Sequence, residues 1–139
     1  MIETYLGFDV GTKRIGVAIA NSLTFEASPL DVIKHHKDGS YNWEDFDRLM
    51  SQYDLTSAIV GLPKTEDNQD QEMTFIAKSF ARKLNERYQI PVHLIDEHLS
   101  SIEAKKTLKY NHDHENSDRG EVDKYAAKLI LQTWLNENR

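Results

Sequence analysis

Two apolar segments joined by a very short connection constrain the fold of this chain more than any other feature. Residues 4–10 and 14–20 both have the composition of strands, and only residues 11–13 lie between them. A connection of this length joins neighbouring antiparallel strands, so the chain is expected to begin with a hairpin. A third strand is expected over residues 27–34, where Pro29 favours a strand start or a sheet edge.

The rest of the chain alternates between helical and strand patterns. Helices are expected over residues 43–53, 73–88, 100–109 and 118–136, and strands over residues 57–60 and 92–96. The strand at 92–96 is nearly continuous in apolar residues, which is typical of a strand covered on both faces. This order predicts an α/β protein whose mixed five-stranded sheet has its first three strands antiparallel and helices on both faces. At 139 residues, we expect a single domain over 1–139.

Composition excludes several classes of function. The chain has no cysteine, which rules out disulfides and thiolate metal sites. Its formal charge of −6 argues against indiscriminate binding of nucleic acid. The N-terminus lacks the pattern of a signal peptide, and no apolar run approaches the roughly 20 residues of a membrane helix. We therefore expect a cytoplasmic protein without a membrane partner.

Three acidic residues stand next to apolar elements, where an unpaired carboxylate is unfavourable. Asp9 lies within the first strand, Glu97 follows the strand at 92–96, and Asp123 shares a helical face with apolar residues of the last helix. Carboxylates near a core are normally paired or bound to a metal. If the three converge, they form an all-oxygen site suited to Mg²⁺ or Mn²⁺, and so to phosphate chemistry.

Each of these residues also has a purely structural explanation. Asp9 before a glycine can be a turn former. Asp96 and Glu97 can both interact with the start of a following helix. We interpret Glu97 as the functional member of the pair and Asp96 as mainly structural, although the two could be exchanged. Asp123 can interact favourably with the dipole of its own helix. Beyond the acids, Lys64 follows a strand end and is a candidate phosphate ligand.

The motifs resemble those of the YqgF family. The similar blocks, in the family's order, are residues 8–18, 59–63, 96–101 and 122–127, and together they span nearly the whole chain. The resemblance implies an RNase H-like fold. It also implies a nuclease that matures the 5′ end of precursor 16S ribosomal RNA, in a family earlier described as Holliday junction resolvases.

Carried over residue by residue, the resemblance makes Asp9, Glu97 and Asp123 the catalytic, metal-binding residues. Lys13 and Arg14 match basic positions of the family. With Lys64, His98 and Arg119, these two complete the set expected to contact the substrate. His98 stands where the family usually has arginine, so a permanent cation is replaced by a titratable group. The loop after residue 63 also departs from the family pattern, and both changes affect substrate contacts rather than metal ligands.

The leading hypothesis is a Mg²⁺- or Mn²⁺-dependent endonuclease acting on structured nucleic acid, with precursor 16S ribosomal RNA as substrate and a monomer or homodimer as the working form. One alternative is a Holliday junction resolvase acting on branched DNA, which would favour a symmetric dimer. A second is a non-catalytic nucleic-acid-binding or ribosome-assembly module. A third alternative is a nucleotide-binding enzyme, because residues 9–12 resemble the phosphate loop of actin-like ATPases and sugar kinases. Those enzymes enclose nucleotide between two such domains, and this chain has the length of one, so we rank this alternative low.

Overall fold

The computed structural model describes residues 1–64, 71–97 and 119–138. The expected helix at 100–109, the polar segments after residues 64 and 109, and His98 fall largely or wholly outside these ranges. Of Arg119, only the backbone is described. Among the described helices, none is long and apolar enough to cross a bilayer.

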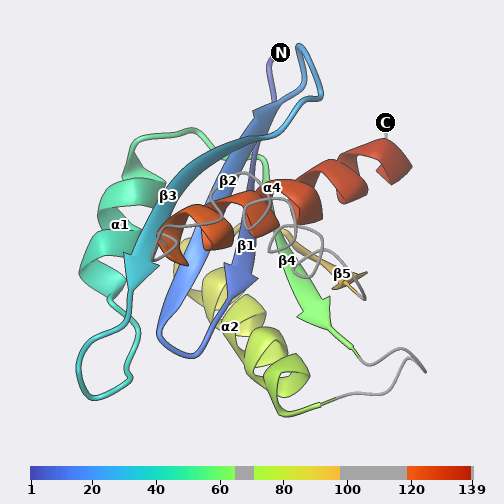
Figure 1. Ribbon diagram of the computed structural model, residues 1–139. Helices are drawn as coiled ribbons and strands as arrows, with labels where there is room; N and C mark the ends of the chain where they lie inside the picture. Colours follow the sequence, from blue (N-terminus) through green and yellow to red (C-terminus); the bar gives the residue numbers. More distant parts are fainter. Residues whose placement is uncertain (65–70, 98–118, 139) are drawn as a thin grey trace.

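A mixed sheet forms the centre of the molecule (Figure 1). Its strands are β1 (Thr4–Val10), β2 (Arg14–Asn21), β3 (Ser28–Lys34), β4 (Ser57–Pro63) and β5 (Val92–Glu97), in the spatial order β3-β2-β1-β4-β5. The pairs β1–β2 and β2–β3 are antiparallel, whereas β1–β4 and β4–β5 are parallel. This topology confirms the predicted hairpin and the five-stranded mixed sheet, and Pro29 lies on an edge strand as expected.

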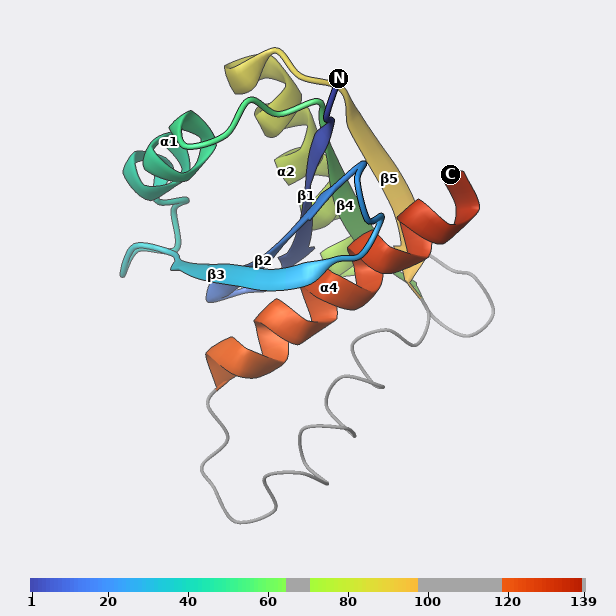
Figure 2. The ribbon, with the colours of Figure 1, turned by 90° about the horizontal axis from the view of Figure 1, so that it is seen from above.

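Helices cover both faces of the sheet, as predicted. The helices are α1 (Trp43–Ser51), α2 (Glu72–Tyr88) and α4 (Arg119–Asn138). Seen from above, α1 and α2 lie on one side of the sheet and α4 crosses the other (Figure 2). Two apolar clusters correspond to these faces: a larger one that contains the buried residues of α1 and α2, and a smaller one under α4.

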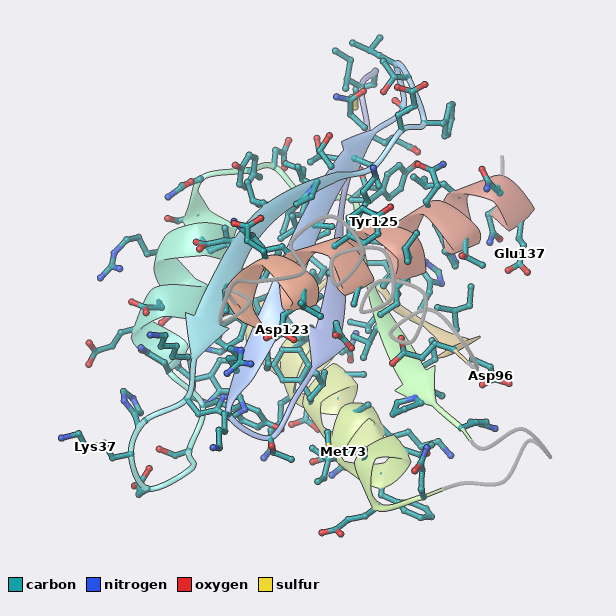
Figure 3. The ribbon with its side chains drawn as sticks, viewed as in Figure 1. Lys37, Met73, Asp96, Asp123, Tyr125 and Glu137 are labelled. Atoms are coloured by element: carbon teal, nitrogen blue, oxygen red, sulfur yellow. The ribbon has the colours of Figure 1, made fainter. Side chains whose placement is uncertain are left out.

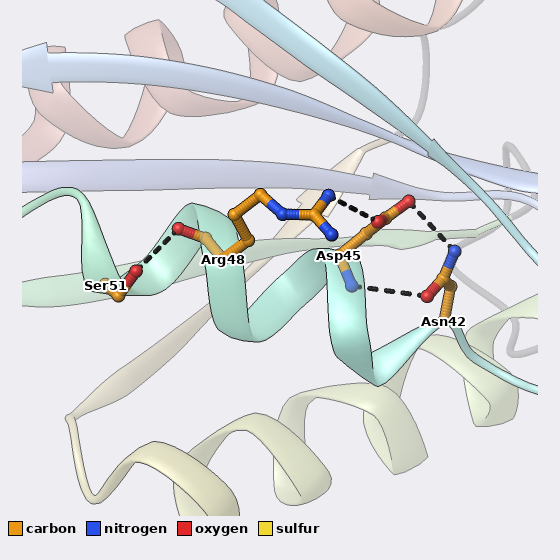
Figure 4. Close-up of polar contacts among 4 residues, drawn as sticks. All are labelled: Asn42, Asp45, Arg48 and Ser51. Carbon is orange, nitrogen blue, oxygen red and sulfur yellow. Dashed lines mark hydrogen bonds and ion pairs between the residues drawn. The ribbon is translucent and has the colours of Figure 1, made fainter.

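Helix α1 begins where the sequence predicts, because Asn42 caps it (Figure 4). The Asn42 side-chain oxygen accepts a hydrogen bond from the backbone N–H of Asp45 at 3.2 Å. The Asp45 carboxylate in turn accepts from the Asn42 amide and from Arg48, both at 2.9 Å. A capped first turn with a negative charge near the positive end of the helix is favourable, so α1 is fixed at its N-terminus.

The alternation of β1 decides which way Asp9 faces. Leu6 and Phe8 belong to the cluster under α1 and α2, where Phe8 packs against the rings of Phe46 and Phe80. The intervening residues face α4, since a Cβ added at Gly7 would lie 2.7 Å from Leu131 Cβ. Successive side chains in a strand point to opposite faces. Asp9 therefore lies on the face that α4 covers.

Two expectations for the second half of the sheet were wrong. Strand β4 does not end at residue 60 but continues to Pro63, because residues 61–63 pair with residues 95–97 of β5. Strand β5 is not covered on both faces: Leu94 is 46% exposed. The reason is its place at the sheet edge, where β4 is its one partner among the described strands.

Candidate functional site

Carboxylates from three separate elements line one cavity. Asp9 comes from the end of β1, Glu97 is the last residue of β5, and Asp123 lies in the second turn of α4. The cavity has a volume of about 320 Å³. Figure 3 shows Asp123 on the part of α4 that crosses the sheet near the end of β1. The fold thus brings together residues that are up to 114 positions apart in the sequence (123 − 9 = 114).

A glycine in β2 allows α4 to approach this closely. Gly16 pairs with Asp9 across the β1–β2 ladder. A Cβ added at Gly16 would lie 2.1 Å from the carbonyl oxygen of Asp123, a distance that no side chain tolerates. An isolated glycine inside a strand often marks such a close backbone approach. Asp123 is therefore seated directly over the position that pairs with Asp9.

Glu97 is the buried member of the group. Only 8% of its surface is exposed, and its Oε2 has no hydrogen-bond partner among the described residues. A Cβ added at Gly61 of β4 would lie 3.0 Å from the Glu97 carboxyl carbon, so the glycine leaves space for this side chain. Burial, and then the negative charge of Asp9, raises the pKa of Glu97 from 4.5 to about 9.

Asp123 differs from Glu97 in having a basic partner. Its Oδ2 accepts a hydrogen bond from the Nε of Arg14, the first residue of β2, and the two groups form an ion pair. Both side chains are 22% exposed, which places the pair at the rim of the cavity. Arg14 thus neutralises one of the three carboxylates, whereas Glu97 and Asp9 repel each other within the same cavity.

The donor set fits a hard divalent cation, although not as a complete cage. Within the parts of the chain that the structure describes, no group of three or more His, Asp or Glu side chains is arranged to hold a metal ion. Nevertheless, Glu97 has an unsatisfied buried oxygen beside Asp9. A cation bound there would attract both carboxylates and so offset the repulsion between Glu97 and Asp9. Arg14 occupies Oδ2 of Asp123, so a cation bound by that oxygen would compete with Arg14.

Among the basic residues expected to contact the substrate, the structure describes the side chains of Lys13, Arg14 and Lys64. Lys13 and Arg14 line a second cavity of about 240 Å³, which shares Gly11, Thr12 and Asp123 with the first. Lys64 directly follows Pro63, which lines the first cavity, and its Nζ lies 3.6 Å from Asp96 at the outer edge of β5. Lys13 and Arg14 thus line a cavity that adjoins the acidic group, whereas Lys64 lies at the β4–β5 edge of the site without lining either cavity.

The ambiguity between Asp96 and Glu97 is resolved by the register of β5. Glu97 lines the acidic cavity, whereas the Asp96 side chain is 42% exposed and lies at the outer edge of the sheet (Figure 3). Successive residues of a strand face opposite sides. Only one of the two can therefore point toward α4, and it is Glu97.

Sequence reasoning missed the residue that supports the turn beside Asp9. His35, which follows β3, donates a hydrogen bond from Nε2 to the carbonyl oxygen of Gly11 at 3.0 Å. Its backbone N–H also bonds to the carbonyl of Lys13 at 2.9 Å. No sequence signal identifies this role, because it depends on β3 pairing with β2 at a particular register.

Comparisons with known proteins agree with the fold and place the chain in a family. A protein of Legionella pneumophila (strain Paris) that bears the name "Putative pre-16S rRNA nuclease" is 41% identical over 134 residues, covering 96% of each chain. A protein of the same name from Coxiella burnetii (strain Dugway 5J108-111) is 40% identical over 141 residues, covering 96% of this chain and 93% of that one.

Solved structures show the same fold at low identity. Thermus thermophilus RuvC in complex with a Holliday junction substrate aligns with a TM-score of 0.54 and 13% identity, covering 97% of this chain and 94% of that chain. The fowlpox virus Holliday junction resolvase aligns with a TM-score of 0.54 and 17% identity, covering 99% of both. These neighbours confirm the RNase H-like fold. The family model described as "RuvX: Holliday junction resolvase" matches residues 3–137, and the chain therefore belongs to the RuvX (YqgF) family.

Proposed function

We propose that this chain is a divalent-metal-dependent endonuclease that hydrolyses phosphodiester bonds in structured nucleic acid, with the 5′ end of precursor 16S ribosomal RNA as its substrate. The observation that carries the proposal is the cavity in which Asp9, Glu97 and Asp123 meet. Support for the substrate comes from the names of the relatives that share about 40% identity over nearly the whole chain. Residues 1–139 would act as one nuclease domain in the cytoplasm.

The three carboxylates would hold Mg²⁺ or Mn²⁺, since these ions prefer hard oxygen ligands. When bound, the ion supplies a water of lowered pKa and stabilises charge on the phosphoryl oxygens. Asp9 and Glu97 fix the reaction centre, because both project from the ends of sheet strands. Asp123 is positioned by the packing of α4 on Gly16. Rigid attachment of this kind holds reacting groups in a productive geometry.

The basic residues at the rim would bind the substrate. Lys13 and Arg14, which line the cavity that adjoins the acids, would contact phosphates next to the scissile bond. Arg14 would move from Asp123 to a phosphate when the carboxylate takes up the metal ion. Lys64, His98 and Arg119 are proposed as further substrate contacts, with Lys64 at the β4–β5 edge of the site.

Cleavage assays with matched amide variants test this proposal. Purified wild type should cut a precursor 16S ribosomal RNA fragment in Mg²⁺ or Mn²⁺ and not in EDTA. Asp9→Asn, Glu97→Gln and Asp123→Asn should each lose cleavage by at least about 100-fold, the size of effect seen when one stabilising group is removed from an active site. Asp54→Asn is the control, because this exposed side chain lies outside the acidic cavity. Full activity of Asp9→Asn would refute the mechanism.

A Holliday junction remains the second candidate substrate, because the family description names it. A four-way DNA junction has two-fold symmetry, so its resolution would require a symmetric dimer with two acidic cavities. Sedimentation of the protein with a junction and with the RNA fragment distinguishes the two. A dimer on the junction and symmetric DNA cuts would favour resolution, and a monomer that cuts only RNA would favour maturation. Tight binding without metal-dependent cutting by any preparation would instead favour a non-catalytic binding module.

A further inference from the structure

A third cavity continues the line that begins at the acidic group. It lies between the end of β3 and the start of α4, has a volume of about 330 Å³, and shares Arg14 with the cavity around Lys13. We call it the β3–α4 cleft; its polar lining comprises Arg14, Asp31, Lys34, Gly120, Glu121 and Lys124. Consecutive cavities share lining residues, so the three are neighbours along this end of the sheet.

We propose that the β3–α4 cleft is a phosphate-binding track, in which Lys34 and Lys124 hold the nucleic-acid backbone that leaves the acidic cavity past Arg14. The inference rests on the proposed nuclease function and extends it to two residues outside the expected substrate contacts. Its ligand is the phosphodiester backbone, which is common to RNA and DNA. Such contacts position a nucleic acid without reading its sequence.

The lining of the three neighbouring cavities changes from acidic to basic. The first cavity carries Asp9, Glu97 and Asp123, whereas the cleft carries three cations, Arg14, Lys34 and Lys124, against two acids. The chain as a whole has a formal charge of −6, so a run of cations that begins beside the acidic cavity is a local exception. An acidic protein can bind a nucleic acid where positive side chains are concentrated, since phosphate contacts come from lysine and arginine.

One acid of the cleft, Glu121, competes with phosphate for one of its cations. Glu121 lies one turn before Lys124 on α4 and forms an ion pair with it at 2.7 Å. The Glu121 side chain is 55% exposed and that of Lys124 is 26% exposed. Exposed pairs of this kind are weak, so a phosphate can displace the glutamate. Removing the glutamate charge should therefore strengthen binding, a result that damage to the fold would not produce.

The first test measures binding without cleavage, by placing every variant in the Asp9→Asn background. Lys34→Gln/Lys124→Gln is compared with Lys78→Gln/Lys128→Gln, which removes the same charge from α2 and from a part of α4 outside the cleft. The probes are a labelled precursor 16S ribosomal RNA fragment and a four-way DNA junction, followed by fluorescence anisotropy. From about 50 to 200 mM salt, the control should lose about 7- to 12-fold more affinity than the cleft variant, since each lost contact lowers the salt slope by about 0.7–0.9.

The second test looks for a gain of affinity. Glu121→Gln should bind both probes about two- to fivefold more tightly at low salt. Glu137→Gln, at the opposite end of the same helix (Figure 3), should leave affinity close to that of the parent. Equal salt slopes for the two lysine double variants, or no difference between the two glutamate variants, would overturn the proposal.

Two outcomes separate the phosphate-binding track from the nuclease activity. If the cleft variants lose affinity while wild type never cuts either probe in Mg²⁺ or Mn²⁺, the track stands and the nuclease mechanism falls. If wild type cuts and the Lys34→Gln/Lys124→Gln protein binds and cuts like it, the nuclease stands and the track falls.

Discussion

Replacement of Glu97 by glutamine should stabilise the protein while abolishing its activity. Burial and the charge of Asp9 raise the pKa of Glu97 from 4.5 to about 9 in the folded state. When the pKa of a carboxyl group is raised in the folded state, the unfolded chain releases the proton at a lower pH than the folded chain does. The free energy of unfolding therefore falls as the pH rises from the unfolded pKa to the folded pKa. The loss for Glu97 therefore begins near pH 4.5 and continues to about pH 9. Glutamine, a neutral side chain of the same shape, has no such loss.

The expected difference follows from the two pKa values. At pH 7 the unfolded carboxyl is ionised and the folded one is still protonated, so the loss is about 2.5 pKa units, or about 3 kcal/mol. At pH 5 the corresponding loss is about 1 kcal/mol. For a domain of this size, about 3 kcal/mol corresponds to an increase of about 10 °C in the melting temperature of Glu97→Gln over wild type at pH 7.

Urea unfolding in EDTA, at intervals from pH 5 to pH 8, measures this effect. The free-energy advantage of Glu97→Gln over wild type should widen as the pH rises, and Asp9→Asn should recover part of it by removing the neighbouring charge. Glu86→Gln is the control, since this glutamate is exposed on α2 and should show no pH-dependent gain. Parallel stability curves for wild type and Glu97→Gln would refute the reasoning that Glu97 is held in an unfavourable site.

Three further substitutions test separate parts of the structure. Arg14→Gln frees Asp123 from its ion pair and should tighten Mn²⁺ binding by about fivefold, measured by calorimetry, while weakening affinity for nucleic acid. Gly16→Ala inserts a methyl group 2.1 Å from the Asp123 carbonyl, so urea unfolding should show a loss of about 1–3 kcal/mol together with a loss of cleavage. Phe80→Ala empties a fully buried position between α1, α2 and the sheet. The free energy of unfolding in urea should fall by about 3–5 kcal/mol.

The local patterns were sufficient to predict most of the sheet. The three-residue connection predicted the β1–β2 hairpin, and the pattern after Asn42 predicted α1 with its cap. The apolar composition of residues 92–96 predicted a strand covered on both faces. This prediction was wrong because β5 is an edge strand. Whether a strand is central or at an edge depends on which strands pair, and sequence composition does not contain that information.

The three carboxylates that line the cavity could be named from the sequence, but their geometry could not be predicted. Asp9 and Glu97 could be recognised as carboxylates at strand ends, and the family resemblance agreed with the choice of Glu97 over Asp96. What the sequence could not show was the ion pair between Arg14 and Asp123, which joins residues 109 positions apart. The same holds for the support that His35 gives to the turn beside Asp9. Both depend on tertiary packing rather than on local preference.

We propose that Asp9, Glu97 and Asp123 together bind a divalent cation at the reaction centre. Titration of the protein with Mn²⁺, followed by the loss of the free ion's electron paramagnetic resonance signal, tests this claim directly. Wild type and Asp96→Asn should bind the ion with equal affinity, and Asp9→Asn and Glu97→Gln should each lose that binding. Unchanged Mn²⁺ affinity in the Asp9→Asn and Glu97→Gln proteins would show that these carboxylates do not hold the ion.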